Sequence, residues 1–146
     1  VVNNMEDDCL YIVGTGTTTR AVMQKLGLPN TLLGVDAVLN YQRVGSDLNE
    51  SQLLEVIKDK STKIIVGVIG GQGYIFGRGN QQISAEVIKK VGKECIIVLA
   101  TLDKITTLKG APLLVDTGDK EIDEHLSGYM KVISGFGERI VLKVEY

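Results

Sequence analysis

Short apolar runs alternate along this chain with segments of helical spacing, and this alternation limits the possible fold more than any other feature. The apolar runs are short and rich in β-branched residues, as strands are. They cover residues 10–13, 31–39, 63–69, 95–100 and 112–116. Apolar residues recur at helical spacing in segments 20–26, 49–58, 85–90, 103–108 and 121–126. Such an order predicts an α/β fold with a mostly parallel sheet and flanking helices.

The carboxyl-terminal end has a different pattern. Residues 129–133 and 138–144 alternate apolar and polar side chains around Gly135-Phe136-Gly137. This pattern predicts a C-terminal β-hairpin. Residues 41–47 are polar, and we expect them to form a loop.

The length of 146 residues suits a single α/β domain spanning residues 1–146. The chain begins with Val1 rather than Met. We therefore expect it to be a piece of a larger protein, although a processed start would look the same.

Composition narrows the classes of partner. A formal net charge of -2 argues against a nucleic-acid partner, which usually needs a basic face. No apolar run approaches the roughly 18 residues of a membrane span. We do not expect the acidic amino-terminal segment to act as a signal peptide. Cys9 and Cys95 are far apart and form no CxxC motif. We expect buried thiols, no metal site and a cytoplasmic protein.

A loop rich in glycine and threonine follows the first strand. The first loop, Gly14-Thr15-Gly16-Thr17-Thr18-Thr19-Arg20, stands between that strand and a helix. Ligands of parallel sheets bind at the carboxyl ends of strands, and a helix N-terminus offers free N–H groups to phosphate. Arg20 can pair with an anion. The third glycine of the dinucleotide fingerprint is missing, so a threonine-capped turn without a ligand is the alternative.

The second loop, residues 70–82, holds five glycines and follows the strand at residues 63–69. Connections of this length are often functional, although a surface loop whose aromatic residues pack on the domain is the alternative. We expect both loops to lie side by side and to form a pocket for a nucleotide or another phosphate-bearing small molecule. The candidate ligand-binding residues of the second loop are Gly70, Gly71, Gln72, Gly73, Arg78, Asn80 and Gln81.

Three aspartates are further candidates for binding. Asp36 lies 20 residues after Gly16, near the spacing at which dinucleotide folds bind a ribose hydroxyl. Asp116 and Asp119 close another strand and can hold Mg²⁺ or move a proton. A cap or turn role is the alternative for all three.

These motifs resemble the carboxyl-terminal portion of the ATP-NAD kinase-like (AcoX-type) family over nearly the whole chain. The stretch from Ile69 to Ile83 is the most distinctive part. The other similar segments are residues 10–21, 31–36 and 115–119.

The resemblance implies phosphoryl transfer from ATP to the 2′-hydroxyl of NAD, which gives NADP. It also implies an amino-terminal kinase domain as partner, because the family carries its catalytic Gly-Gly-Asp-Gly-Thr signature there. In this chain, Gln72 stands where the acidic residue of such a signature would be. No catalytic residue can therefore be assigned, and the chain alone is expected to be incomplete as a kinase.

Two other functions remain open. The Gly-Thr-Gly-Thr-Thr-Thr motif is similar to the phosphate loop of ribose-5-phosphate isomerase-like enzymes, which would suit a sugar-phosphate-binding or isomerase-like module. A structural domain is the other possibility. We expect a homo-oligomer, which the C-terminal hairpin can form through an exposed strand edge.

Overall fold

The computed structural model describes residues 4–29, 34–69, 71–135 and 138–146. These residues form one sheet with the strand order β3-β2-β1-β4-β6-β8-β9-β7-β5. The strands are β1 Cys9–Val13, β2 Asp36–Leu39, β3 Gln42–Gly45, β4 Ser61–Gly67, β5 Tyr74–Phe76, β6 Ile96–Leu99, β7 Leu113–Val115, β8 Gly128–Gly135 and β9 Glu138–Glu145. The α-helices are α1 Thr17–Leu26, α2 Glu50–Val56, α3 Ala85–Val91, α4 Leu102–Thr107 and α5 Lys120–Leu126.

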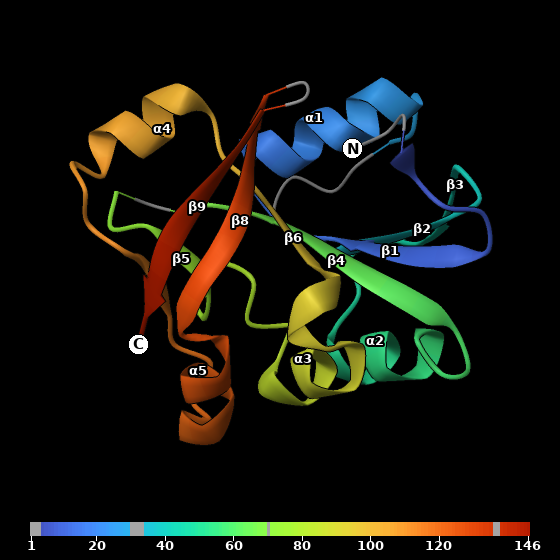
Figure 1. Ribbon diagram of the computed structural model, residues 1–146. Coiled ribbons are helices and arrows are strands. Elements are labelled where there is room, and N and C mark those ends of the chain that lie inside the picture. The colour runs from blue at the N-terminus through green and yellow to red at the C-terminus, as the bar shows by residue number, and fades with distance from the viewer. Residues whose placement is uncertain (1–3, 30–33, 70, 136–137) are drawn as a thin grey trace.

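The predicted α/β fold is confirmed. The pairs β1–β4, β4–β6, β6–β8, β5–β7 and β7–β9 are parallel, whereas β1–β2, β2–β3 and β8–β9 are antiparallel. Figure 1 shows α1 and α4 above the sheet, and α2, α3 and α5 below it. The strands β8 and β9 form the predicted C-terminal hairpin.

The main core lies on the face of the sheet that α2, α3 and α5 cover. It joins Val66 of β4, Phe76 of β5 and Val132 of β8 to Leu53, Val87 and Leu126 of those helices. A bridge between Ile69 and Tyr74 also connects β5 to the chain just beyond β4. β5, which ends the sheet order, therefore lies close to the central strand β4. The strands β4, β6, β8, β9, β7 and β5 thus curve around a shared interior.

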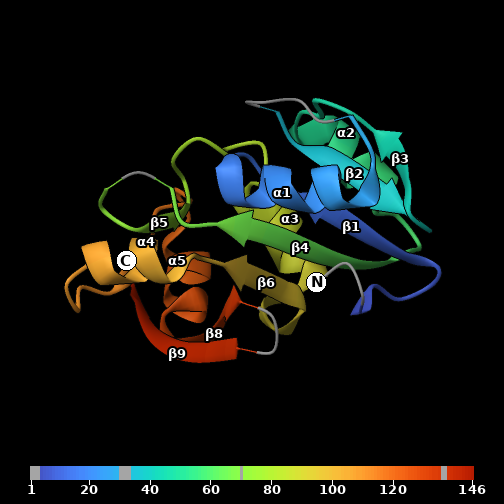
Figure 2. The same ribbon diagram turned by 90° about the horizontal axis from the view of Figure 1, so that it is seen from above.

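A second core lies on the opposite face, under α1 (Figure 2). Val22 and Met23 of α1 pack there against Tyr11 of β1 and Ile65 of β4. The helix ends at Gly27, which adopts the left-handed conformation with φ 72°. Glycine favours this geometry because it has no Cβ to clash.

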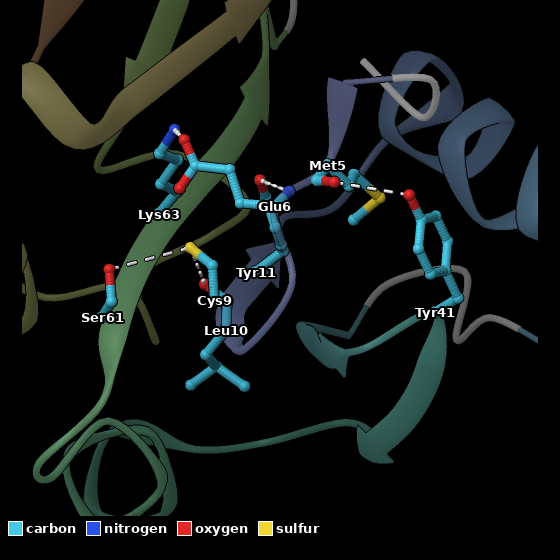
Figure 3. Close-up of polar contacts among 8 residues, drawn as sticks. All are labelled: Met5, Glu6, Cys9, Leu10, Tyr11, Tyr41, Ser61 and Lys63. Atoms are coloured by element: carbon cyan, nitrogen blue, oxygen red, sulfur yellow. Dashed lines mark hydrogen bonds and ion pairs between the residues drawn. The ribbon is translucent and has the colours of Figure 1, made fainter.

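The segment before β1 is fastened to the same face (Figure 3). The Glu6 amide donates to the Tyr11 hydroxyl at 2.9 Å, and Lys63 Nζ lies 3.0 Å from Glu6 Oε1. The Tyr41 hydroxyl donates to the Met5 carbonyl at 3.3 Å. Burial raises the pKa of Tyr11 above its ordinary value, and the hydrogen bond to Glu6 raises that of Lys63.

Four expectations about individual elements need correction. Residues 42–45 form strand β3 rather than a loop, and residues 74–76 of the second loop form strand β5. The first helix begins at Thr17, before the expected Arg20. Asp36 begins β2 instead of ending a strand, while residues 31–33 of that expected strand lie outside the described part.

The strand edge of the C-terminal hairpin that we expected to be free is partly paired, because Val144 and Glu145 of β9 lie against β7. β8 pairs with β6, and the end of β9 pairs with β7, so the hairpin lies within the sheet. The sheet order instead places β3 at one end. In the described ranges no helix is long and apolar enough to cross a membrane.

Candidate functional site

The first loop is held in shape by its own backbone and by Thr19. The Gly14 amide donates to the Ile65 carbonyl at 2.9 Å, which continues the ladder between β1 and β4. The buried Thr19 hydroxyl lies 2.8 Å from the Gly14 carbonyl and 3.1 Å from that of Gly16. Thr19 therefore shapes the loop from inside, and its side chain is not exposed to a ligand.

The amino terminus of α1 is open. Its N-cap is Gly16, which provides no side-chain hydrogen bond to the first turn, and that turn contains no acidic residue. A Cβ added to Gly16 would meet no atom within 4 Å, so there is free space in front of the helix. Thr17 and Arg20 are exposed here. Free N–H groups beside an arginine suit an anion.

The two loops lie side by side, as expected. The Thr15 hydroxyl donates to the Gly79 carbonyl at 3.0 Å, across 64 positions of sequence. A Cβ added to Gly79 would also lie 3.8 Å from the Thr15 hydroxyl. The contact comes from the later part of the second loop, after β5. Thr15 is buried, and its hydroxyl holds the two loops together.

Side chains of this later part have different exposures. Arg78 is exposed, and its guanidinium carbon lies 4.6 Å from the centre of the Tyr74 ring. Gln81 is exposed too. Asn80 is completely buried, and its Nδ2 donates to the Ile75 carbonyl at 2.9 Å. Its Oδ1 has no partner within the described residues. Asn80 thus anchors the loop, whereas Arg78 and Gln81 remain accessible.

The earlier part of the second loop points elsewhere. Gly71 and Gln72 are exposed in the turn between β4 and β5. The Gly73 carbonyl accepts the amide of Leu114, and a Cβ added to Gly73 would lie 2.9 Å from Leu108 Cδ2. Gly73 therefore packs beside β7 and the end of α4. Gly70 lies outside the described residues.

Asp36 lies at the same edge as the first loop. β2 runs antiparallel to β1, so the start of β2 lies beside the end of β1, and Asp36 pairs in register with Val13. Asp36 is 2% exposed, and its Oδ1 accepts the amide of Asp47 at 3.0 Å. This bond fastens the turn after β3 to the edge beside the first loop.

Asp116 and Asp119 lie around the start of α5. Asp119 caps this helix, because its Oδ1 accepts the amides of Glu121 at 3.0 Å and Ile122 at 3.2 Å. Asp116 is exposed, and its amide donates to the Phe76 carbonyl. No group of three or more His, Cys, Asp or Glu residues could hold a metal ion in the described part of the chain.

Sequence reasoning missed Asp123. This buried carboxylate accepts the Thr117 amide at 3.0 Å and the Thr117 hydroxyl at 2.7 Å. It therefore orders the turn between the two predicted aspartates. The only sequence signal was a threonine in that turn, followed by a helix with an acidic residue on its inner side.

A groove of about 780 Å³ lies away from both loops. It is formed where α2 and α3 end and β4 begins, whereas the loops lie beyond the opposite end of β4. Sequence patterns gave no signal for it, because it combines two helix ends with the start of a strand. It is lined by Leu54, Ile57, Lys58, Asp59, Lys60, Ser61, Thr62, Lys90, Val91 and Cys95.

The mostly parallel sheet with flanking helices defines the class as an α/β protein, in which glycine-rich loops follow β1 and β4. The family model described as the ATP-NAD kinase C-terminal domain matches residues 6–144. The chain belongs to this family. No curated protein and no solved structure matches it.

Proposed function

We propose that this chain is the nucleotide-binding C-terminal domain of an ATP-dependent NAD kinase-like protein, which converts NAD to NADP. The observation that carries this proposal is the hydrogen bond between Thr15 and Gly79. It joins the two glycine-rich loops at the open amino terminus of α1. The family match and the contact between the two loops together support the proposal.

The proposed pocket suits a phosphate group. The first turn of α1 presents amides without a side-chain cap, and Gly16 leaves the approach open. Arg20 and Arg78 are exposed on the two loops and can supply charge-assisted hydrogen bonds. Gln81 adds a donor and an acceptor for a base or a ribose.

Further predicted residues support the pocket indirectly. Thr15, Thr19 and Asn80 use their side chains to shape and join the loops. Asp36 fastens the neighbouring turn through Asp47. We propose that these four residues position the pocket and that Arg20, Arg78 and Gln81 contact the ligand.

The catalyst is proposed to be incomplete in this chain. ATP, when bound, supplies the phosphoryl group and NAD the acceptor hydroxyl. The Gly-Gly-Asp-Gly-Thr signature of the family has no counterpart here, because Gln72 occupies the acidic position. Asp116 is exposed and Asp119 caps a helix, so neither is assigned to catalysis. Kinase activity is expected only with an amino-terminal domain that carries the signature.

Calorimetric titration of the chain with NAD, NADP, ATP and ribose 5-phosphate tests the proposal. We expect binding of at least one of the three nucleotides. Arg20→Ala and Arg78→Ala should each weaken it by roughly 1–3 kcal/mol, since each removes a charge-assisted hydrogen bond. Arg43→Ala is the control, because Arg43 lies on β3 and contacts the Pro29 carbonyl. Thermal unfolding of each variant should stay close to that of the parent chain.

Three results would contradict the proposal. The first is the absence of binding by folded protein for all three nucleotides. The second is an equal loss of affinity in Arg43→Ala and in the loop variants, which would place the ligand elsewhere. The third is selective binding of ribose 5-phosphate, which would favour the sugar-phosphate module.

A further inference from the structure

The groove at the ends of α2 and α3 lies far from the proposed nucleotide pocket. The two helices lie side by side below β4 (Figure 1), and the groove reaches Ser61 and Thr62 at the start of that strand. The Ile65 carbonyl, near the other end of β4, accepts the amide of Gly14 in the first loop. A strand rises about 3.3 Å per residue, so the seven residues of β4 span about 20 Å. The groove is therefore a separate candidate site.

The size and the walls of this groove suit a small organic molecule. Its volume of about 780 Å³ falls within the roughly 300–1,000 Å³ of most ligand pockets. Leu54, Ile57 and Val91 form an apolar wall, and the Ser61 side chain adds a hydroxyl. Apolar walls with a few polar groups bind the hydrocarbon part of a ligand and fix its orientation.

Three lysines and one aspartate also line the groove, so its charged groups are mostly positive. Lys60 Nζ donates to the Val56 carbonyl at 2.8 Å, at the partially negative end of α2. This bond uses one of the three N–H donors of the ammonium group. Lys58 pairs with Glu55 at 2.9 Å, but both side chains are largely exposed, and such pairs contribute little. Lys90 has no ion pair within the described residues. The groove therefore offers ammonium donors to an anion.

We propose that this groove binds a small amphipathic anion, in which a carboxylate or a phosphate is attached to an apolar body. The anionic group contacts Lys58 and Lys90, and the apolar body packs on Leu54, Ile57 and Val91. Burial of the apolar body supplies most of the affinity, because exposed charges contribute less. The lysines supply the selectivity for a negative charge. This site does not depend on the nucleotide pocket, so either proposal can fail alone.

A cysteine in the wall of the groove can report whether the groove is occupied. Cys95 is a half-buried free thiol that lines the groove, whereas Cys9 is only 2% exposed. The expectation of buried thiols thus holds for Cys9 alone. A small neutral reagent such as iodoacetamide should modify Cys95 first, because reactivity follows access to the thiol. A molecule bound in the groove should slow this modification.

The test measures the rate at which iodoacetamide modifies Cys95 in the full chain, by mass spectrometry, with four probes. Octanoate and octyl phosphate should slow the modification in proportion to their occupancy of the groove, and their relative potency shows whether a carboxylate or a phosphate is preferred. Octanol and inorganic phosphate should protect much less, because each lacks half of the recognised chemistry. Cys95→Ser should abolish the fast modification, which confirms where the reagent acts.

Two neighbouring lysines of α3 provide a matched pair of variants. Lys90→Ala should raise the dissociation constant of octanoate about fivefold, because it removes an ammonium donor from the groove. Lys89→Ala should leave this constant unchanged, since Lys89 is exposed in the last turn of the same helix but lies outside the lining. Val91→Thr keeps the shape of the wall but makes it polar, so it should also weaken octanoate binding. Circular dichroism checks that each variant folds.

The proposal is overturned if neither octanoate nor octyl phosphate slows the modification of Cys95 at millimolar concentration. Protection by octanol or by inorganic phosphate that equals protection by octanoate also overturns it, because the ligand would then not need both a charge and an apolar body. So does an equal loss of octanoate affinity in Lys90→Ala and Lys89→Ala, which would reduce the effect to net charge. None of these outcomes changes the expected binding of nucleotides at residues 16–20 and 78–81.

Discussion

Gly77 shows why one position in the second loop accepts only glycine. Its φ is +92°, and an added Cβ would lie 1.9 Å from the Asp116 carbonyl oxygen. The loop after β5 therefore packs its backbone directly on the end of β7. Neither the backbone angle nor the neighbour 39 positions away could be inferred from the sequence, which showed only a glycine-rich stretch.

Replacement of Gly77 by alanine should be strongly destabilising. We expect Gly77→Ala to lower the free energy of unfolding by at least about 3 kcal/mol, because backbone strain and a clash add together. Gly118→Ala is the control: its φ is +85°, but no atom lies within 4 Å of the added Cβ. It should cost about 1–2 kcal/mol, from strain alone. Urea unfolding measures both, and equal losses would show that Gly77 does not pack on Asp116.

Tyr11 and Lys63 contribute stability that is lost at alkaline pH. Burial raises its pKa above 10.0, and the hydrogen bond to Glu6 raises that of Lys63 above 10.5. The folded chain therefore holds both protons more tightly than the unfolded chain. The resulting stability is complete below about pH 10 and is lost as pH rises through the folded pKa values.

Tyr11→Phe should reduce this alkaline loss. The variant lacks the titrating hydroxyl, so its free energy of unfolding should fall less steeply between roughly pH 9 and 11. At neutral pH it should be less stable by about 1 kcal/mol, since the Glu6 amide loses its acceptor. Urea unfolding at several pH values checks this. Parallel pH profiles for the two proteins would rule out the contribution of Tyr11.

At the scale of elements, two exposed aspartates near the start of α5 are expected to differ in their contribution to stability. Asp119→Ala removes the cap of the helix and should cost about 1 kcal/mol of unfolding free energy. Asp116→Ala changes an exposed side chain and should cost less than about 0.5 kcal/mol. Chemical denaturation distinguishes them. The capping role would be wrong if both variants were equally stable.

Long, buried strands were predictable from the sequence, whereas short ones were not. The run from Lys63 to Val66 is nearly all apolar because both faces of β4 are covered, and this composition shows in the sequence. β3 has no such pattern, since it lies at an end of the sheet with half-exposed or exposed residues. β5 has only three residues between glycines, and its pairing with β7 depends on contacts distant in sequence.

At the scale of the whole molecule, the adjacency of the two loops was predictable, but its details were not. Parallel strands end at one edge, so loops after β1 and β4 had to be neighbours. The second loop passes through β5 before it reaches Thr15, however, and the contact is made by Gly79 rather than by Gly71 or Gly73. Thr15 and Asn80 were expected to contact a ligand, but they are buried and bond to the backbone.

The most direct test of the nucleotide pocket is an NMR titration of the labelled chain with NAD and ATP, followed through its backbone amides. The account predicts that the largest shifts fall on residues 16–20 and 78–81, which lie on different loops and together line the proposed pocket. Shifts confined to the groove between α2 and α3, or to only one of the two loops, would contradict it.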